Sequence, residues 1–257
     1  MMPSLFVTHG APSLVLEQSE YARFLRDVLP AQLERPRAVV LFTAHWEADT
    51  QQVGSGLRPA TLHDFYGWPE ELYRITYPAS GDPDGARAVR DLLRKSGVRA
   101  ELDDARALDH GTWVVMSMLY PDAGIPVIQM SVNPHLSNAE QYQIGRALAV
   151  LKSEGYLIIG SGATVHNLRA LDWDAASAES WTVEFDAWVG ERLLSWNLEE
   201  LFAYEKLAPH ARRSVPRNEH FVPLLISMGA GADRRKAQCL HQTYQYGTLS
   251  LSCWRFD

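Results

Sequence analysis

The sequence contains little cysteine, no long apolar run and no excess of positive charge. Only Cys239 and Cys253 occur among 257 residues, too few for a disulfide framework, and they do not form a CxxC pair. No run approaches the roughly 18 apolar residues of a membrane-spanning helix. Lys and Arg number 24 against 31 Asp and Glu, a formal net charge of -7, which argues against nucleic acid as a partner.

These features also set expectations for organisation and location. The segment from Met1 to Gly10 has no basic stretch followed by a signal-like apolar stretch, so we expect a cytoplasmic protein with no membrane partner. A hydrophobic content of 46% suffices for one large core, and we expect residues 1–257 to form a single catalytic domain. The sequence leaves assembly into a homo-oligomer open. Any metal ion would be held by histidine and carboxylate ligands, since cysteine is scarce.

Short apolar runs rich in β-branched residues alternate with amphipathic helical patterns along the chain. This order predicts an α/β fold, a three-layer α/β/α sandwich with a mostly parallel central sheet. The clearest strands are continuously apolar, as strands covered on both faces should be. They are Ser4–Thr8, Arg37–Ala44, Ile125–Ser131, Tyr156–Ser161 and Leu249–Trp254.

Apolar residues at helical spacing predict several helices between these strands. The pattern covers Tyr21–Leu29, Ala86–Leu93 with a stop at Gly97, and Ser180–Trp196. Ser137 and Glu140 match a capping box that would open a helix ending at Gly155. The segment Val53–Pro83 is rich in Gly, Pro and aromatic residues without a period, which indicates a long ordered loop of a kind that is often functional.

Three histidines lie next to the ends of predicted strands. His9 follows the first strand, His45 follows the second, and His166 lies shortly after the strand that ends near Ser161. Ligands of open parallel sheets bind outside the carboxyl ends of the strands, so these side chains can converge although they are distant in sequence. Neutral imidazole is a common ligand of zinc and ferrous iron. The pattern therefore predicts a histidine metal site at this edge.

Each histidine also has a plainer interpretation, as a hydrogen-bonded core or surface residue. His220 begins an apolar helix, where the neighbouring Glu219 could simply complement the helix dipole. His63 and His110 each stand beside an aspartate that could orient an imidazole or could lie in a solvated loop. For the remaining histidines no supporting context exists and a surface position is expected: His135, His210 and His241.

Six motifs in order along the chain resemble the class III extradiol ring-cleavage dioxygenases, specifically the DOPA 4,5-dioxygenase-like branch. The resemblance runs from Ser4 to the segment Gly247–Ser250, and six matched motifs make a chance similarity improbable. The motifs are Leu5-Phe6-Val7-Thr8-His9-Gly10-Ala11-Pro12, Thr43-Ala44-His45-Trp46, His63-Asp64-Phe65-Tyr66-Gly67-Trp68-Pro69, Asp109-His110-Gly111-Thr112-Trp113, Gly160-Ser161-Gly162-Ala163-Thr164-Val165-His166-Asn167-Leu168 and Glu219-His220-Phe221-Val222-Pro223-Leu224.

The resemblance implies a ligand set and catalytic residues. His9, His45 and His220 correspond to metal ligands, for Fe(2+) in ring cleavage, with Zn(2+) as another ion the same site could contain. His166 corresponds to an acid/base residue at the metal, or to a fourth ligand in zinc-loaded members, and His110 to a second active-site histidine. A more distant, protocatechuate-cleaving branch uses glutamate as its third ligand. The matching motif here offers both Glu219 and His220, and we favour His220.

The activity implied is insertion of both atoms of O2 into a catechol-type substrate, DOPA-like or related, with ring opening. We expect His166 to exchange protons with the substrate and His110 to stabilise bound oxygen species. The loop residues His63, Phe65, Tyr66 and Trp68 are candidates for the substrate wall, or else for packing against the core.

Two other functions would use the same histidines. A zinc hydrolase would activate water and would need a carboxylate base such as Glu47 or Glu219. A non-catalytic metal-binding protein would use the histidines only to hold the fold together. The sequence decides neither the physiological metal nor the particular catechol.

Overall fold

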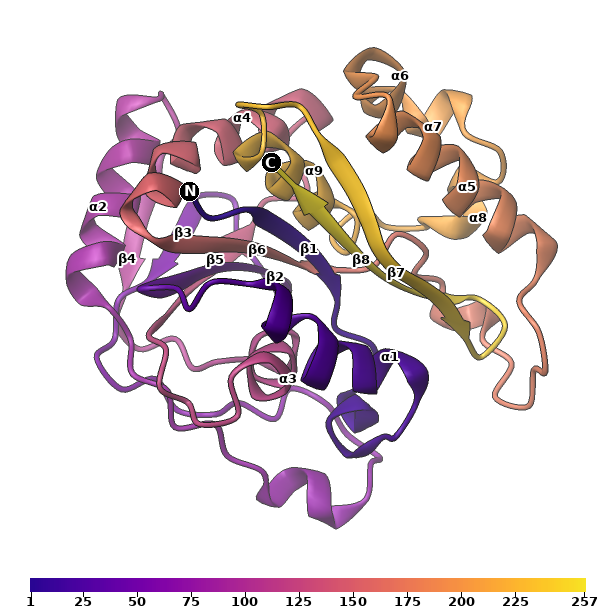
Figure 1. The fold of residues 1–257 in the computed structure, drawn as a ribbon, viewed down its shortest axis with the longest axis horizontal. Helices are drawn as coiled ribbons and strands as arrows, with labels where there is room; N and C mark the ends of the chain where they lie inside the picture. Colours follow the sequence, from indigo (N-terminus) through magenta and orange to yellow (C-terminus); the bar gives the residue numbers. More distant parts are fainter.

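The computed structural model describes residues 1–257, which build one eight-stranded sheet (Figure 1). The strand order across the sheet is β4-β3-β5-β2-β6-β1-β8-β7. The strands are β1 (Ser4–Thr8), β2 (Ala38–Glu47), β3 (Gln51–Gly54), β4 (Ala100–Asp103), β5 (Val127–Val132), β6 (Tyr156–Gly162), β7 (Ala237–Gln245) and β8 (Leu249–Phe256).

The four central strands, β5, β2, β6 and β1, are mutually parallel. Antiparallel pairing occurs only towards the two edges, where β3 pairs with β5, β8 with β1, and β7 with β8. The mostly parallel sheet predicted from the sequence is therefore confirmed. Because the central strands run in one direction, their carboxyl ends meet at one edge, where sheets of this type place their ligands.

Helices cover both faces of the sheet, which confirms the three-layer arrangement. On one face α2, α4 and α9 pack together, and α1 and α3 lie on the other. The short helices α6, α7 and α8 gather with α5 beside β7 and β8 (Figure 1). The α-helices are α1 (Glu20–Arg23), α2 (Pro83–Lys95), α3 (His110–Leu119), α4 (Asn138–Leu148), α5 (Ser180–Leu194), α6 (Leu198–Phe202), α7 (Tyr204–Leu207), α8 (Ala211–Ser214) and α9 (Val222–Ala230).

Shorter helical turns connect these elements. A π-helical turn continues α1, and most of the others are single 3-10 turns in connecting segments. The π turn spans Phe24–Val28, and the 3-10 turns span Pro12–Leu16, Pro30–Gln32, Glu70–Arg74, Ala149–Glu154 and Leu168–Ala170.

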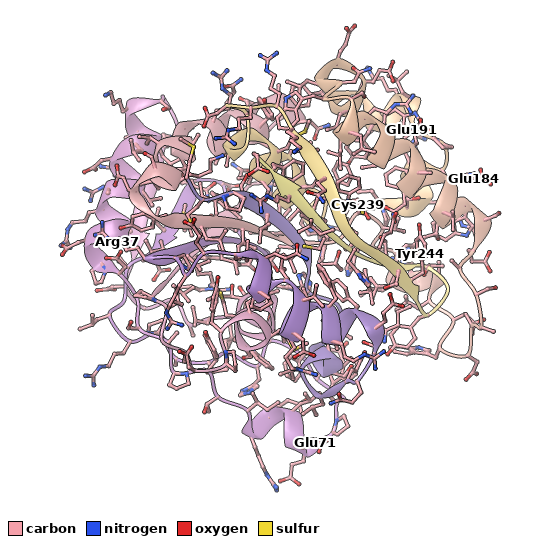
Figure 2. All side chains as sticks on the ribbon, viewed as in Figure 1. Arg37, Glu71, Glu184, Glu191, Cys239 and Tyr244 are labelled. Carbon is pink, nitrogen blue, oxygen red and sulfur yellow. The ribbon has the colours of Figure 1, made fainter.

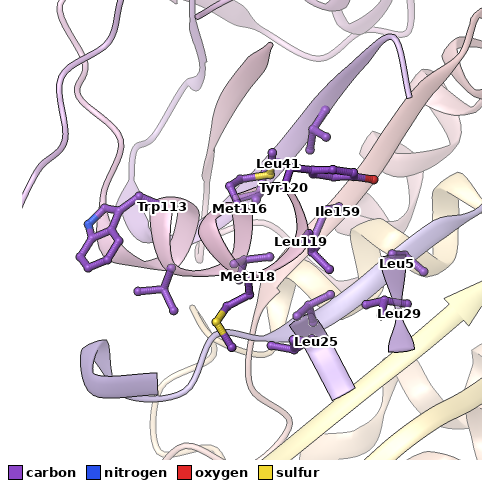
Figure 3. Packing of buried hydrophobic residues seen from close by; sticks show 14 of the residues in the cluster. Leu5, Leu25, Leu29, Leu41, Trp113, Met116, Met118, Leu119, Tyr120 and Ile159 are labelled. Atoms are coloured by element: carbon purple, nitrogen blue, oxygen red, sulfur yellow. The ribbon is translucent and has the colours of Figure 1, made fainter. Parts of the chain in front are cut away.

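Successive residues of the central strands enter different cores, because side chains of a strand alternate between its two faces. In β2, Val39 and Leu41 pack on the α3 side, whereas Val40 packs under α2, α4 and α9. Both faces are buried, which explains the continuous apolar runs. Figure 3 shows the α3-side core, where α3 packs on the strands through Met116, Met118, Leu119, Leu5, Leu41 and Ile159.

Helices α4 and α9 approach so closely that their contact depends on glycine. A Cβ atom at Gly145 of α4 would lie 1.9 Å from the carbonyl oxygen of Ile226, and one at Gly229 of α9 would lie 2.0 Å from that of Tyr142. The start of α9 is also fixed to the sheet, since the Ala163 amide donates to the His220 carbonyl at 2.9 Å. These contacts place His220 beside the carboxyl end of β6.

All five predicted strands exist, although four of them have ends that differ from the prediction, and the prediction missed three other strands. The missed strands β3 and β4 have four residues each, and β7 is mostly polar and only half-buried, so none gives a strong pattern. Strand β2 was predicted to end at Ala44, which would put His45 after it. The strand instead continues to Glu47, because its pairing with β5 shifts register after Phe42 and resumes at Val132.

The predicted helices are confirmed with changes at their ends. Ser137 and Glu140 form the capping box at the start of α4, and Gly155 has the left-handed backbone conformation that ends the helical segment. The stretch predicted as one helix from Tyr21 divides into α1 and the π turn. Helix α3 was not predicted, because it is apolar on all sides and lacks a helical period. The loop Val53–Pro83 is irregular except for the end of β3, an isolated bridge at Thr61, one 3-10 turn and Pro83, which begins α2.

Side chains fill the space on both sides of the sheet, and charged groups such as Glu184 and Glu191 of α5 are exposed (Figure 2). None of the helices combines the length and apolar character required to cross a bilayer.

Replacing Gly145 by alanine should destabilise the protein, because the added methyl group would meet the α9 backbone. Overpacking of this kind costs about 1–3 kcal/mol, measurable as a lower urea midpoint. The matched control is Gly190→Ala in α5, where the nearest atoms to an added Cβ are at 3.4 Å and alanine favours the helix. Equal midpoints for the two variants would contradict the close α4–α9 contact.

Candidate metal centre

Three histidines meet at the carboxyl edge of the parallel strands. His9 follows β1, His45 lies near the end of β2, and His220 precedes α9; one ring nitrogen from each lies within 4.8 Å of the others. The Nε2 atoms of His9 and His45 are 3.0 Å apart. The structure thus brings together the three residues that the sequence predicted as ligands.

A serine fixes the orientation and tautomer of His9. The Ser161 hydroxyl donates its only proton to the Gly111 carbonyl at 2.6 Å. It must therefore accept the hydrogen bond of 2.9 Å that joins it to His9 Nδ1, so His9 carries its proton on Nδ1. Nε2 of His9 is left as a bare lone pair that faces His45.

A carboxylate fixes the orientation and tautomer of His220. Nδ1 of His220 donates to Oε1 of Glu219 at 3.1 Å, which leaves Nε2 unprotonated. This Nε2 atom is buried and has no hydrogen-bond partner, an arrangement that costs free energy unless a ligand satisfies it. Unprotonated imidazole nitrogens that converge on one point suit a divalent transition-metal ion such as zinc or ferrous iron. The residues present therefore fit a metal.

Asp64 orients a fourth histidine, His110. Its Oδ1 atom accepts hydrogen bonds of 2.9 Å from both the backbone amide and Nδ1 of His110, and its Oδ2 atom lies 3.8 Å from Nδ1 of His45. The sequence had left open whether the aspartates next to His63 and His110 orient those imidazoles. The carboxylate beside His63 in sequence instead orients His110.

Asp109, the sequence neighbour of His110, connects the elements that carry the site histidines. Its fully buried carboxylate accepts from the Thr43 hydroxyl at 2.7 Å and caps the first turn of α3 through the Thr112 amide. Arg106 donates to this carboxylate at 3.1 Å and to the His45 carbonyl at 3.2 Å. The network therefore ties α3 to the irregular end of β2 that carries His45.

His166 stacks on His220 at the edge of the cluster. The two ring centroids are 3.5 Å apart and the planes differ by only 12°. The His166 amide donates to the Ser214 carbonyl at 3.0 Å, which fixes the backbone that carries the ring. His166 is thus close to the three-histidine group without a carboxylate bonded to its ring.

Burial keeps the clustered histidines neutral. Burial, reinforced by the neighbouring imidazoles, holds the pKa values of His9 and His220 well below the usual range. Burial also lowers the pKa of His45 to about 3 and that of His166 to about 4. For Asp64, burial raises the pKa, but the hydrogen bonds and charge of His110 outweigh it and bring the pKa down to about 2. Neutral imidazoles beside an ionised carboxylate are ready to bind a cation.

A cavity of about 430 Å³ opens from the histidines to the surface. His9, His45, His110 and His166 line its inner end. Phe65, Tyr66 and Trp68 from the long loop, which the sequence offered as candidates for the substrate wall, are among its lining residues. The lining also includes Leu168, Trp173 and Tyr246.

His63, also predicted at the substrate wall, is placed elsewhere. Its Nε2 atom contacts the Ile75 carbonyl at 3.0 Å, and its ring meets Phe65 edge to face from outside the cavity lining. Among the histidines expected at the surface, His135 and His210 are exposed, whereas His241 is half-buried against Phe24.

Sequence reasoning missed several residues of the site. Ser161 stood inside a quoted motif, and its position at the end of a strand was the available signal. Asp64 was noted only as a neighbour of His63, and its true partner is 46 residues away. The sequence did not indicate Trp173 or Tyr246, because they lie in a connecting segment and in the β7–β8 turn, which only the tertiary fold brings to the cavity.

The fold and the site define an α/β protein with a histidine-rich centre at the carboxyl ends of its parallel strands, open to an aromatic-walled cavity. Residues 4–256 match the family described as the catalytic LigB subunit of aromatic ring-opening dioxygenase, and the chain belongs to this family.

Similar proteins agree with this assignment over the whole chain. The 4,5-DOPA dioxygenase extradiol of Portulaca grandiflora is 38% identical, over 98% of this chain and 95% of its own length. The protein of the same name from Escherichia coli K12 is 35% identical, over 97% and 93%. The crystal structure of an uncharacterized protein from Escherichia coli K12 superimposes with a TM-score of 0.85 at 32% identity, covering 100% of both chains. The resemblance to the DOPA-dioxygenase-like branch is thus confirmed.

The buried histidines predict how the stability of the metal-free protein depends on pH. Below the ordinary pKa of 6.5 the unfolded chain protonates these residues, while folded His166 stays neutral down to about pH 4. The unfolded state then binds more protons, so the free energy of unfolding falls as the pH drops below about 6.5.

The free energy of unfolding should fall between pH 7.5 and pH 5, and this fall should be about 2 kcal/mol smaller in His166→Gln than in the wild type. Urea unfolding at both pH values measures the difference. The control is His135→Gln, which alters an exposed histidine and should keep the wild-type pH dependence. An unchanged pH dependence in His166→Gln would contradict the neutral state assigned to His166.

Proposed function

We propose that this chain is a ferrous-iron extradiol dioxygenase that opens a catechol-type aromatic ring and inserts both atoms of O2. The observation that carries the proposal is the pair of unprotonated Nε2 atoms, on His9 and His220, that converge with His45 at the inner end of an aromatic-walled cavity. Membership of the ring-opening dioxygenase family and relatives named 4,5-DOPA dioxygenase extradiol support it.

In this proposal His9, His45 and His220 hold the metal. When bound, ferrous iron with three protein ligands supplies further coordination positions for both reactants and a redox path between them. Zinc suits the same nitrogens but has no accessible redox change, so a zinc-loaded protein should not consume O2.

His166 is the proposed acid/base residue. Its ring is neutral near pH 7, because burial lowers its pKa to about 4, and a ring nitrogen is free to accept a proton from a catechol hydroxyl. No carboxylate bonds to the ring to stabilise its charged form. A proton taken up there is therefore readily returned later in the reaction.

His110 has a different environment and a different proposed role. Its Nδ1 proton is fixed on Asp64, so Nε2 is the atom available on the cavity side. The hydrogen bond from Nδ1 to Asp64 fixes the orientation of the ring, as the carboxylate of a catalytic triad does for its histidine. In this role Nε2 of His110 contacts an oxygen atom that gains negative charge during the reaction.

The aromatic wall would hold the substrate ring and exclude water. Phe65 meets His110 edge to face at 5.8 Å and packs against Tyr73 at 5.2 Å, so its ring is fixed beside the histidines. Aromatic pairs in such geometries contribute about 0.5–1.5 kcal/mol beyond the area they bury.

The carboxylates that a zinc hydrolase would need as a base are already paired. Both carboxylate oxygens of Glu47 accept hydrogen bonds of 2.8 Å from Arg217, and Glu219 accepts from Nδ1 of His220. Neither residue lines the cavity. The geometry therefore favours ring cleavage over hydrolysis.

The test of the proposed function is O2 uptake by protein that has been reconstituted anaerobically with ferrous iron. Addition of DOPA, caffeate or protocatechuate in air should consume O2 in proportion to the catechol and produce a new visible absorbance. The zinc-loaded protein is the matched control and should remain inactive. If no catechol consumes O2 at full iron occupancy, the dioxygenase proposal fails.

Two variants separate metal binding from proton transfer. His45→Ala should lose bound iron and O2 uptake together, because it removes one of three ligands. His166→Ala should keep its iron but lose turnover by about 100-fold or more, the usual contribution of an acid/base group. Iron contents are measured beside activity, with His135→Ala as the surface control; iron retained by His45→Ala would overturn the ligand assignment.

A further inference from the structure

The cavity that opens from the histidines contains no formal charge of its own. None of its 18 lining residues is Lys, Arg, Asp or Glu, and 10 of them are hydrophobic. A carboxylate or ammonium group bound in the cavity away from the histidines would find no oppositely charged side chain in the lining, and an unpaired buried charge is costly. The polar groups instead gather at the inner end, where a catechol ring would bind in the proposed reaction.

Apolar side chains continue from the cavity to its mouth. Tyr66 is 92% exposed, Trp173 60% and Leu168 63%, and all three line the same cavity. Exposed apolar residues scattered singly need no explanation, but a group of them around one opening indicates a binding surface. The mouth therefore suits an apolar group that extends outward from a bound ring.

This outer wall is held in place by the hairpin between β7 and β8. Trp173 packs against Tyr246 with ring centroids 4.4 Å apart. The Asp172 amide donates to the Tyr246 carbonyl at 3.1 Å, and the Glu179 amide donates to the Gly247 carbonyl at 2.8 Å. The aromatic pair is thus part of a hydrogen-bonded structure that is formed before any ligand binds.

The charged groups around this wall are acidic as well as basic. Glu17 lies near Tyr246 and accepts a hydrogen bond of 3.2 Å from Gln245, so its carboxylate would repel a carboxylate on a ligand. Arg169, next to Leu168, is exposed and is not part of the cavity lining. No cation is therefore positioned at the cavity wall to bind an acidic side chain.

We propose that the substrate is a catechol with an uncharged apolar substituent, alkyl or aryl, which contacts Trp173 and Tyr66 in the cavity lining. This inference rests on the proposed function, because it concerns the same cavity, and it distinguishes this chain from a protein built for the charged side chain of DOPA. Burial of the substituent stabilises the complex by about 25 cal/mol for each Å² of apolar surface removed from water.

The experiment compares kcat/KM of the iron-loaded protein for 4-phenylcatechol and 4-tert-butylcatechol with that for DOPA and protocatechuate. We expect the two apolar catechols to be favoured by about tenfold or more, equivalent to about 1.4 kcal/mol. Calorimetry with the zinc-loaded, redox-inert protein gives a second measurement. 4-Phenylcatechol should bind more tightly than DOPA and with a more negative heat-capacity change, the sign of apolar burial.

Trp173→Ala should weaken binding of 4-phenylcatechol by about tenfold while binding of unsubstituted catechol changes by less than about twofold. The matched control is Leu207→Ala, an exposed apolar residue of α7 outside the cavity, which should alter neither. A preference for DOPA or protocatechuate, or equal effects of Trp173→Ala on both ligands, would overturn the inference and leave the dioxygenase proposal standing. Absence of O2 uptake with every catechol would refute the dioxygenase proposal. The calorimetric comparison would still show whether the cavity binds the apolar catechol more tightly than DOPA.

Discussion

The burial of neutral imidazoles that face one another is the constraint on which the rest of the site depends. Two unprotonated nitrogens, on His9 and His220, stand close to His45, and the buried Nε2 atom of His220 has no hydrogen-bond partner. Such an arrangement is unfavourable unless a cation occupies it or the surrounding structure enforces it. Ser161 and Glu219 enforce the tautomers through the opposite ring nitrogens. These outer contacts are as much a part of the centre as the histidines themselves.

Close contacts within the fold hold the histidines and their partners in position, and these contacts leave little room for larger side chains. The start of α9 lies so close to β6 that a Cβ at Gly162 would be 2.1 Å from the His220 carbonyl oxygen. The Asp109 network joins α3 to the end of β2, and His45 lies in the part of β2 where the pairing register shifts. Stability and function are thus coupled here, because the same close packing that holds α9 on the sheet positions His220.

The amino-acid sequence predicts the layers of the fold and the gathering of His9, His45 and His166, because buried strands have continuous apolar runs and parallel strands share a carboxyl edge. Spacing alone did not assign His220, whose context also fits a helix start; the motif resemblance identified it. The partner of Asp64 and the wall formed by Trp173 and Tyr246 could not be predicted, since they depend on how irregular segments pack. Strands β3, β4 and β7 escaped detection because they are short or half-exposed.

The most direct test of this account is X-ray absorption at the iron edge of the anaerobic, ferrous-loaded protein without substrate. Three histidine ligands should give the scattering pattern of imidazole rings with iron–nitrogen distances of roughly 2.0–2.2 Å, and a weaker ring signal when His220 is replaced by alanine. Iron surrounded only by oxygen ligands, or an identical spectrum for the His220→Ala protein, would contradict the proposal that these three histidines form the metal centre.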